Sequence, residues 1–202
     1  MSGLIQLDQV DGAFAAREEW GANCGPVALA AALGLTLDEI RPAVSPGGSF
    51  RGHMGIRDIR EAVGRAGSEV VRSWSKVFGP IDCMEFGLQM KAAHRRLRLG
   101  DWPLLVVVRF GGPWDGNPRA SATYRHVICY RHCKAAGFEH EQKLRGPGWV
   151  LDAGQREGGA AYWLPVRKWA NRTLLDLIPD RGSGLVSVDW IGEVCQTNRG
   201  EP

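Results

Sequence analysis

The segment NCGPVALAAALG, residues 23–34, decides the fold. Asn23 suits the N-cap of a helix, Pro26 suits its first turn, and Gly34 suits the position just after its last turn. Apolar residues occupy nearly every side of the helix between these signals, which indicates that the helix is buried. We therefore expect a short core helix that carries a cysteine, Cys24, at its N-terminal end.

Helical patterns continue through the first half of the chain. Thr36 and Glu39 have the spacing of a capping box, which predicts the start of a second short helix. Two further segments have apolar residues at helical spacing, residues 56–67 and residues 84–100.

The second half has the pattern of strands. Residues 103–110, PLLVVVRF, form a short run rich in β-branched residues, as is typical of a buried strand. Further strands are expected at 125–133, 148–153 and 184–194, with one helix at 165–178 that has Pro165 in its first turn. Helices followed by a group of antiparallel strands predict the α+β class.

Composition limits the possible classes of protein. A chain of 202 residues, 44% hydrophobic and 23% charged, is expected to form a single globular domain over residues 1–202. The longest apolar run is far shorter than the roughly 20 residues that cross a bilayer, so we expect no membrane partner. A net charge of +3 gives little reason to expect nucleic acid. The N-terminal residues lack the basic and apolar regions of a signal peptide, so we expect a cytoplasmic protein.

One of the five cysteines has the setting of a nucleophile. Cys24 begins the predicted core helix, and a helix N-terminus stabilises a thiolate through its partial positive charge and free N–H groups. The same N–H groups could bind the oxyanion that forms when the sulfur attacks a carbonyl carbon. The simpler alternative is that Cys24 is a small buried residue, which is common for free cysteine.

Two later residues supply the partners that a thiol nucleophile needs. His126 begins a predicted strand after a glycine-rich loop, and Asp152 ends the next strand in the sequence WVLDAG. If these strands are neighbours, the carboxylate can orient the imidazole and stabilise its charged form. We therefore predict a catalytic triad of Cys24, His126 and Asp152.

These motifs resemble those of the papain-like cysteine peptidases, in particular the bacteriocin-processing peptidase domains of export transporters. The matching motifs are Cys24-Gly25-Pro26, His126-Val127-Ile128 and Leu151-Asp152-Ala153. The sequence also resembles a set of tailed-phage proteins, through GGPWDG (111–116), TYRHVICY (123–130), WVLDAG (149–154) and LPVRKWAN (164–171).

The resemblance implies a two-lobed fold, with the nucleophile helix in an N-terminal helical lobe and an antiparallel sheet in the C-terminal lobe. It also implies a thiol peptidase that cleaves a peptide or isopeptide bond in a polypeptide substrate, without a cofactor or metal. The alternative is a phage virion or assembly protein that keeps a peptidase fold for binding other phage structural proteins. The location would then be the host cytoplasm or the virion.

One position departs from the family pattern. The family carries Gln about six residues before the nucleophile, where its amide completes the oxyanion hole, and this chain has Glu18 there. A carboxylate cannot donate to an oxyanion unless it is protonated, which predicts impaired catalysis. Asn23 is a candidate substitute donor, as is Gln9 if its loop bends back.

Other patterns in the chain favour weaker alternatives. Cys129, His132, Cys133 and His140 are residue types that bind zinc, but their spacing matches no finger pattern, and a strand entering a polar hairpin is the simpler interpretation. The basic residues of HRRLRLG (94–100) follow an amphipathic pattern, which favours a solvated helix face over a phosphate site.

Overall fold

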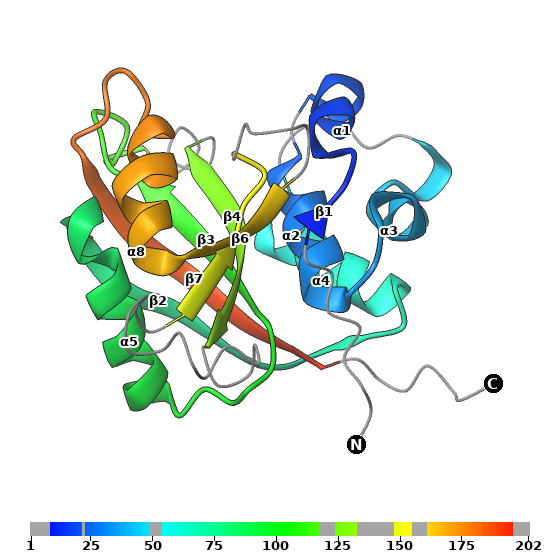
Figure 1. Cartoon of the computed structure of the whole chain (residues 1–202). Helices are drawn as coiled ribbons and strands as arrows, with labels where there is room; N and C mark the ends of the chain where they lie inside the picture. The colour runs from blue at the N-terminus through cyan, green and yellow to red at the C-terminus, as the bar shows by residue number, and fades with distance from the viewer. Residues whose placement is uncertain are drawn as a thin grey trace.

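Antiparallel strands form a central sheet, and helices lie on both of its faces (Figure 1). The computed structural model describes residues 9–21, 23–48, 54–117, 124–132, 148–154 and 161–195. Within them the strand order is β1-β6-β5-β4-β3-β7-β2. The strands are β1 (Gln9–Val10), β2 (Glu69–Asp82), β3 (Leu104–Phe110), β4 (Arg125–His132), β5 (Gly148–Leu151), β6 (Ala161–Pro165) and β7 (Leu185–Cys195).

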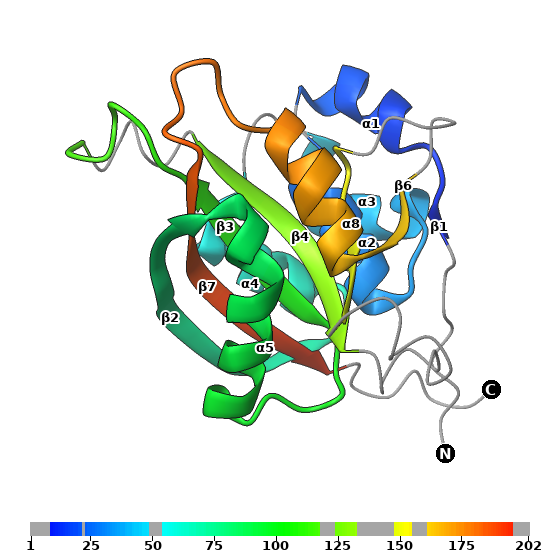
Figure 2. The same cartoon turned by 60° about the vertical axis from the view of Figure 1, so that its left-hand side comes forward.

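The helices divide between the two faces of the sheet. Figure 2 shows α5 and α8 in front of the sheet and α2, α3 and α4 behind it. The helices of the face behind are α1 (Ala13–Trp20), α2 (Cys24–Leu33), α3 (Leu37–Val44) and α4 (Ile56–Arg65), with a short turn η1 (Pro46–Gly48). Those in front are α5 (Phe86–Leu97), preceded by η2 (Cys83–Glu85), and α8 (Val166–Trp169), which continues as a π-helical turn η4 (Ala170–Leu174).

The fold is mixed α+β with an antiparallel sheet, as predicted. The sequence pattern predicts no strand before residue 103, which is wrong for the short β1 and for β2, the strand that pairs with β7 at the edge of the sheet. Most β2 side chains are exposed or only half-buried, so this strand lacks the alternation of buried and exposed residues that identifies a strand. Its register with β7 also shifts three times, so no single period describes it.

The core helix forms where its sequence predicts. Cys24–Leu33 is helical, every residue in it is buried, and Gly34 ends it with a φ of 63°. Asn23 holds the N-cap position, but its side chain accepts no hydrogen bond from the helix. The capping box of Thr36 and Glu39 is confirmed at the start of α3.

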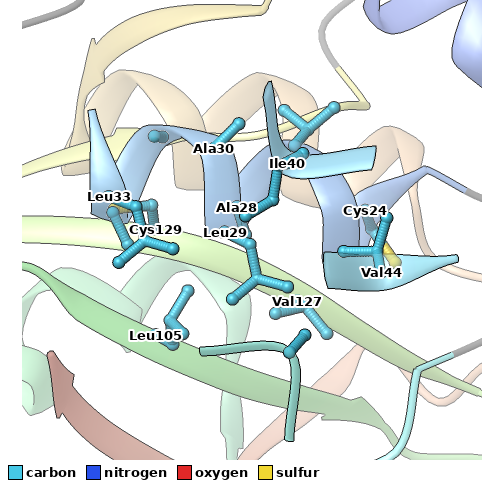
Figure 3. Packing of buried hydrophobic residues seen from close by; sticks show 14 of the residues in the cluster. Cys24, Ala28, Leu29, Ala30, Leu33, Ile40, Val44, Leu105, Val127 and Cys129 are labelled. Carbon is cyan, nitrogen blue, oxygen red and sulfur yellow. The ribbon is translucent and has the colours of Figure 1, made fainter. Parts of the chain in front are cut away.

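The core helix packs directly on the middle of the sheet. Leu29 and Leu33 lie over Val127 and Cys129 of β4, with Leu105 of β3 beside them (Figure 3). Burial of one such Leu side chain contributes about 1.5–3 kcal/mol of stability. This packing fixes the position of the helix relative to the strand that carries His126.

A second apolar cluster fills the opposite face of the sheet. Phe86 and Met90 of α5 and Trp169 of α8 are fully buried there, against β3, β4 and β7. The sheet therefore separates two cores. Among the described residues, no helix has the length and apolar character to cross a membrane.

Candidate active site

Cys24 is the first residue of α2 and lies at the edge of the hydrophobic core between α2 and the sheet. The side chain keeps 9% exposure, although the helix behind it is fully packed. The carbonyl of Asn23 accepts the first helical hydrogen bond, from Val27 N at 3.0 Å. The first amides of a helix have no partner within the helix, so they can bind an anion beside the sulfur.

His126 lies near the start of β4, the strand on which α2 packs. It pairs with Val108 of β3 in the sheet register and is 8% exposed. Its side chain shares a face of β4 with Ile128, because alternate residues of a strand point to the same side. The ring also lies near Phe110, with 6.5 Å between ring centroids.

Strand register brings Asp152 to His126. Cys129 pairs with Leu151, so Asp152 lies level with Ile128, one step along the same face from His126. His126 Nε2 and Asp152 Oδ1 are 2.6 Å apart, as expected for a charge-assisted hydrogen bond. Asp152 is fully buried, so the imidazole is its charge partner inside the protein.

Two further donors hold the Asp152 carboxylate. The backbone N–H of Gly154 donates to Oδ1 at 2.7 Å, and the indole Nε1 of Trp169 donates to Oδ2 at 2.7 Å. Burial alone would raise the pKa of Asp152, but the charge of His126 and these hydrogen bonds outweigh it and lower that pKa. Asp152 is therefore an ionised carboxylate with fixed orientation.

The same contacts favour the charged form of His126. Burial opposes the imidazolium, but the Asp152 charge, the hydrogen bond to Asp152 and the interaction with the Cys24 thiol raise the pKa of His126 well above its usual value. Asp152 occupies Nε2, which leaves Nδ1 for the hydrogen bond between His126 and Cys24. The three residues predicted from the sequence are thus in one connected chain of hydrogen bonds.

The two residues considered for the oxyanion hole differ in setting. Glu18 is exposed on α1, and its neighbour Glu19 forms an ion pair with Arg41 of α3. Asn23 is buried, and its side-chain amide donates to the carbonyl of Ala13. One hydrogen of the Asn23 amide thus bonds the first residue of α1 and is not available to an oxyanion.

Sequence reasoning missed Trp169 and Gly154 as partners of Asp152. Gly154 follows the aspartate by two residues, a spacing typical of a carboxylate that bonds the backbone just after it. Trp169 gives no comparable signal, because its contact depends on how α8 crosses the sheet. The sequence also gives no sign that Met54 packs against Gly25, beside Cys24. The Met54 Sδ lies 2.6 Å from the position that a Cβ on Gly25 would occupy.

The described residues contain no group of three or more His, Cys, Asp or Glu side chains arranged to hold a metal ion. Of the considered zinc ligands, Cys129 is buried in the core and His132 stacks on His94, with 4.2 Å between ring centroids. Cys133 and His140 lie outside the described residues, so the cluster itself is not placed.

Comparison of the chain with family models, with curated proteins and with solved structures finds no match in any of the three.

Proposed function

We propose that this chain is a papain-like thiol hydrolase that cleaves a peptide or isopeptide bond through Cys24. The observation that carries the proposal is the position of His126, which hydrogen-bonds the thiol of a helix N-terminal cysteine on one side and a buried aspartate on the other. A nucleophile, a base and a group that orients the base are the parts that acyl transfer requires.

In the first step the Cys24 thiolate attacks the substrate carbonyl carbon, and a C–S bond forms as the carbonyl π electrons move to oxygen. The oxyanion then reforms the carbonyl, the C–N bond breaks, and the His126 imidazolium gives its proton to the leaving amine. The products of this step are a free amine and a thioester on Cys24.

In the second step neutral His126 takes a proton from water, and the hydroxyl attacks the thioester carbon. The C–S bond breaks, the acid is released, and the thiolate–imidazolium pair is restored. Among the groups that take part in these steps Asp152 contacts the imidazole, so its role is to position the ring and stabilise its charged form.

The packing supports the papain-like form of this proposal. The nucleophile helix α2 lies on one face of the sheet, and the base enters from β4 of that sheet. The two-lobed description divides the molecule into α1–α4 and the sheet with α5 and α8, with the site at the boundary between them.

The alternative function is a phage virion or assembly protein that binds other structural proteins through this fold, with little turnover. Glu18 favours it, because an exposed carboxylate stands where the resembled peptidases have an amide donor. Under this alternative the triad would serve stability rather than chemistry.

A peptide-like thiol probe tests the proposal. An acyloxymethyl ketone peptide should label Cys24 in the wild type, and Cys24→Ala should abolish labelling and release of product from peptide esters. His126→Gln should reduce both without unfolding the chain, as checked by circular dichroism. Equal labelling of wild type and His126→Gln, together with intact biological function in Cys24→Ala, would favour the structural role.

A further inference from the structure

A cavity with both polar and apolar walls adjoins the triad at Gly154, beside Asp152. Its volume is about 780 Å³, and its wall runs from Gly154 past Tyr162 of β6 to the exposed side of α8 and η4. Gly154 is both part of this wall and a hydrogen-bond donor to Asp152. The cavity wall therefore contacts the Asp152 carboxylate directly, through Gly154.

The charged groups on the wall are mainly positive. Lys168 and Arg172 lie four residues apart along α8 and η4, both are exposed, and Asp176 is the carboxylate that shares the cavity. Neither Lys168 nor Arg172 forms an ion pair with any residue that the structure describes. Two cations on one concave surface, with no ion-pair partner in the described part of the chain, favour an anionic ligand.

The chemistry of the triad indicates which part of a substrate could reach this surface. The acyl half of the substrate stays on the Cys24 sulfur, while the amine half departs beside the imidazole that protonates it. The polypeptide after the cleaved bond must therefore run on the His126 side. Three successive side-chain or backbone contacts, Cys24 to His126, His126 to Asp152 and Asp152 to Gly154, lead from the sulfur to the cavity wall. An extended chain covers about 3.3 Å per residue, so a substrate that follows this path reaches the cavity within a few residues of the cleaved bond.

We propose that this cavity binds a carboxylate on the amine half of the substrate, and this inference rests on the proposed thiol hydrolase function. The carboxylate comes either from an Asp or Glu side chain or from a free C-terminus. Lys168 and Arg172 would each donate to it, whereas Asp176 would oppose it. The specificity of the enzyme would then include an acidic group a few residues after the cleaved bond.

Binding to the Cys24→Ala variant of the full chain tests this without turnover. The probes are a fluorescein-labelled octapeptide with three consecutive Glu residues near its C-terminus and the same peptide with Gln, each with a free and an amidated C-terminus. Fluorescence anisotropy gives the dissociation constants at low and at moderate salt. We expect the Glu peptide to bind at least tenfold more tightly than the amidated Gln peptide, with the preference reduced by salt.

Charge variants locate the binding surface. Adding Lys168→Gln and Arg172→Gln to Cys24→Ala should remove the preference, and Asp176→Asn should increase it severalfold. Arg167→Gln is the matched control, because it removes the same charge from α8 but Arg167 packs beside Gly87 of α5, outside the cavity wall. The amidated peptides separate the two carboxylate sources. If the amidated Glu peptide still binds tightly, the carboxylate is a side chain; if its tight binding is lost, the carboxylate is the C-terminus.

Equal binding of all four peptides, binding of none of them, or a preference over the amidated Gln peptide that survives the double variant would overturn the inference. Failure of the proposed function gives a different result, since wild type would then show no Cys24-dependent cleavage whatever the cavity binds. If wild type cleaves, mass spectrometry should place the acidic residues on the product that carries the new amine.

Discussion

The indole Nε1 of Trp169 donates a 2.7 Å hydrogen bond to Oδ2 of Asp152, and both side chains are fully buried. Asp152 in turn is 2.6 Å from His126, so a tryptophan on α8 holds the carboxylate that orients the imidazole. Trp169 touches no reacting atom, and its role is to position the carboxylate.

Trp169→Phe removes this donor and keeps most of the packing against Phe86. We expect a loss of about 1–3 kcal/mol in the free energy of unfolding, because a buried acceptor loses a partner. A lost donor also raises the pKa of Asp152, so acid unfolding should begin at higher pH than in the wild type. Urea unfolding across pH 3–7 measures both effects, and a uniform loss at every pH would indicate a packing role alone.

The pair of His126 and Asp152 should stabilise the protein within a defined pH window. The pKa of His126 is raised, so its contribution is complete below about 6.5, the unfolded value, and is lost as pH rises through the folded value. The pKa of Asp152 is lowered, so its contribution is present above about 3.9 and is lost as pH falls through the folded value.

The difference in unfolding free energy between wild type and His126→Gln should therefore be largest between about pH 4 and pH 6.5 and decline on both sides. Denaturant melts at one-unit intervals of pH give the curve. A difference that grows steadily above pH 7 would contradict the assigned direction for His126.

Cys24 should react with iodoacetamide at pH 6 faster than the other cysteines. An imidazolium beside the sulfur stabilises the thiolate, which is the reactive form. Burial raises the pKa of Cys83, and it raises the pKa of Cys129 to about 12, so these thiols stay protonated. Peptide mapping after brief labelling measures each site. His126→Gln serves as the control, and equal labelling of all cysteines would argue against activation of Cys24.

Glu18→Gln should raise turnover of peptide esters under the proposed function, because it replaces a charged acceptor with a neutral donor at the position where the peptidases that the sequence resembles bind the oxyanion. We expect weak or absent turnover in the wild type and a gain of up to on the order of 100-fold. Glu19→Gln is the matched control, since it makes the same change one residue away, at a carboxylate that bonds Arg41 and Trp20. Fast wild-type turnover that Glu18→Gln leaves unchanged would place the oxyanion donors elsewhere.

Gly25 and Met54 should be coupled in stability. A Cβ on Gly25 would lie 2.6 Å from Met54 Sδ, so Gly25→Ala should cost about 1–3 kcal/mol through overpacking. Met54→Ala provides the missing space, and the double variant should be more stable than the sum of the single losses predicts. A double-mutant cycle by chemical denaturation measures the coupling, and strict additivity would mean that Met54 moves aside without cost.

Local signals in the sequence were sufficient for several elements. The apolar run and terminal Gly34 define α2, the capping box of Thr36 and Glu39 defines the start of α3, and β-branched runs define β3 and β4. Each of these signals acts over a few residues, where hydrogen bonding and burial depend on near neighbours. For the same reason Cys24, His126 and Asp152 could be chosen as candidates from their places at element ends.

Tertiary structure alone decided which of these groups meet. The edge strand β2 is recognisable only through its pairing with β7, because its own side chains are mostly solvent-exposed. Trp169 reaches Asp152 only because α8 crosses the sheet face beside β5. The order of the strands and the crossing of the helices result from burial summed over both cores. No local stretch of sequence contains that information, so the contact between Asp152 and Trp169 is seen only in the folded chain.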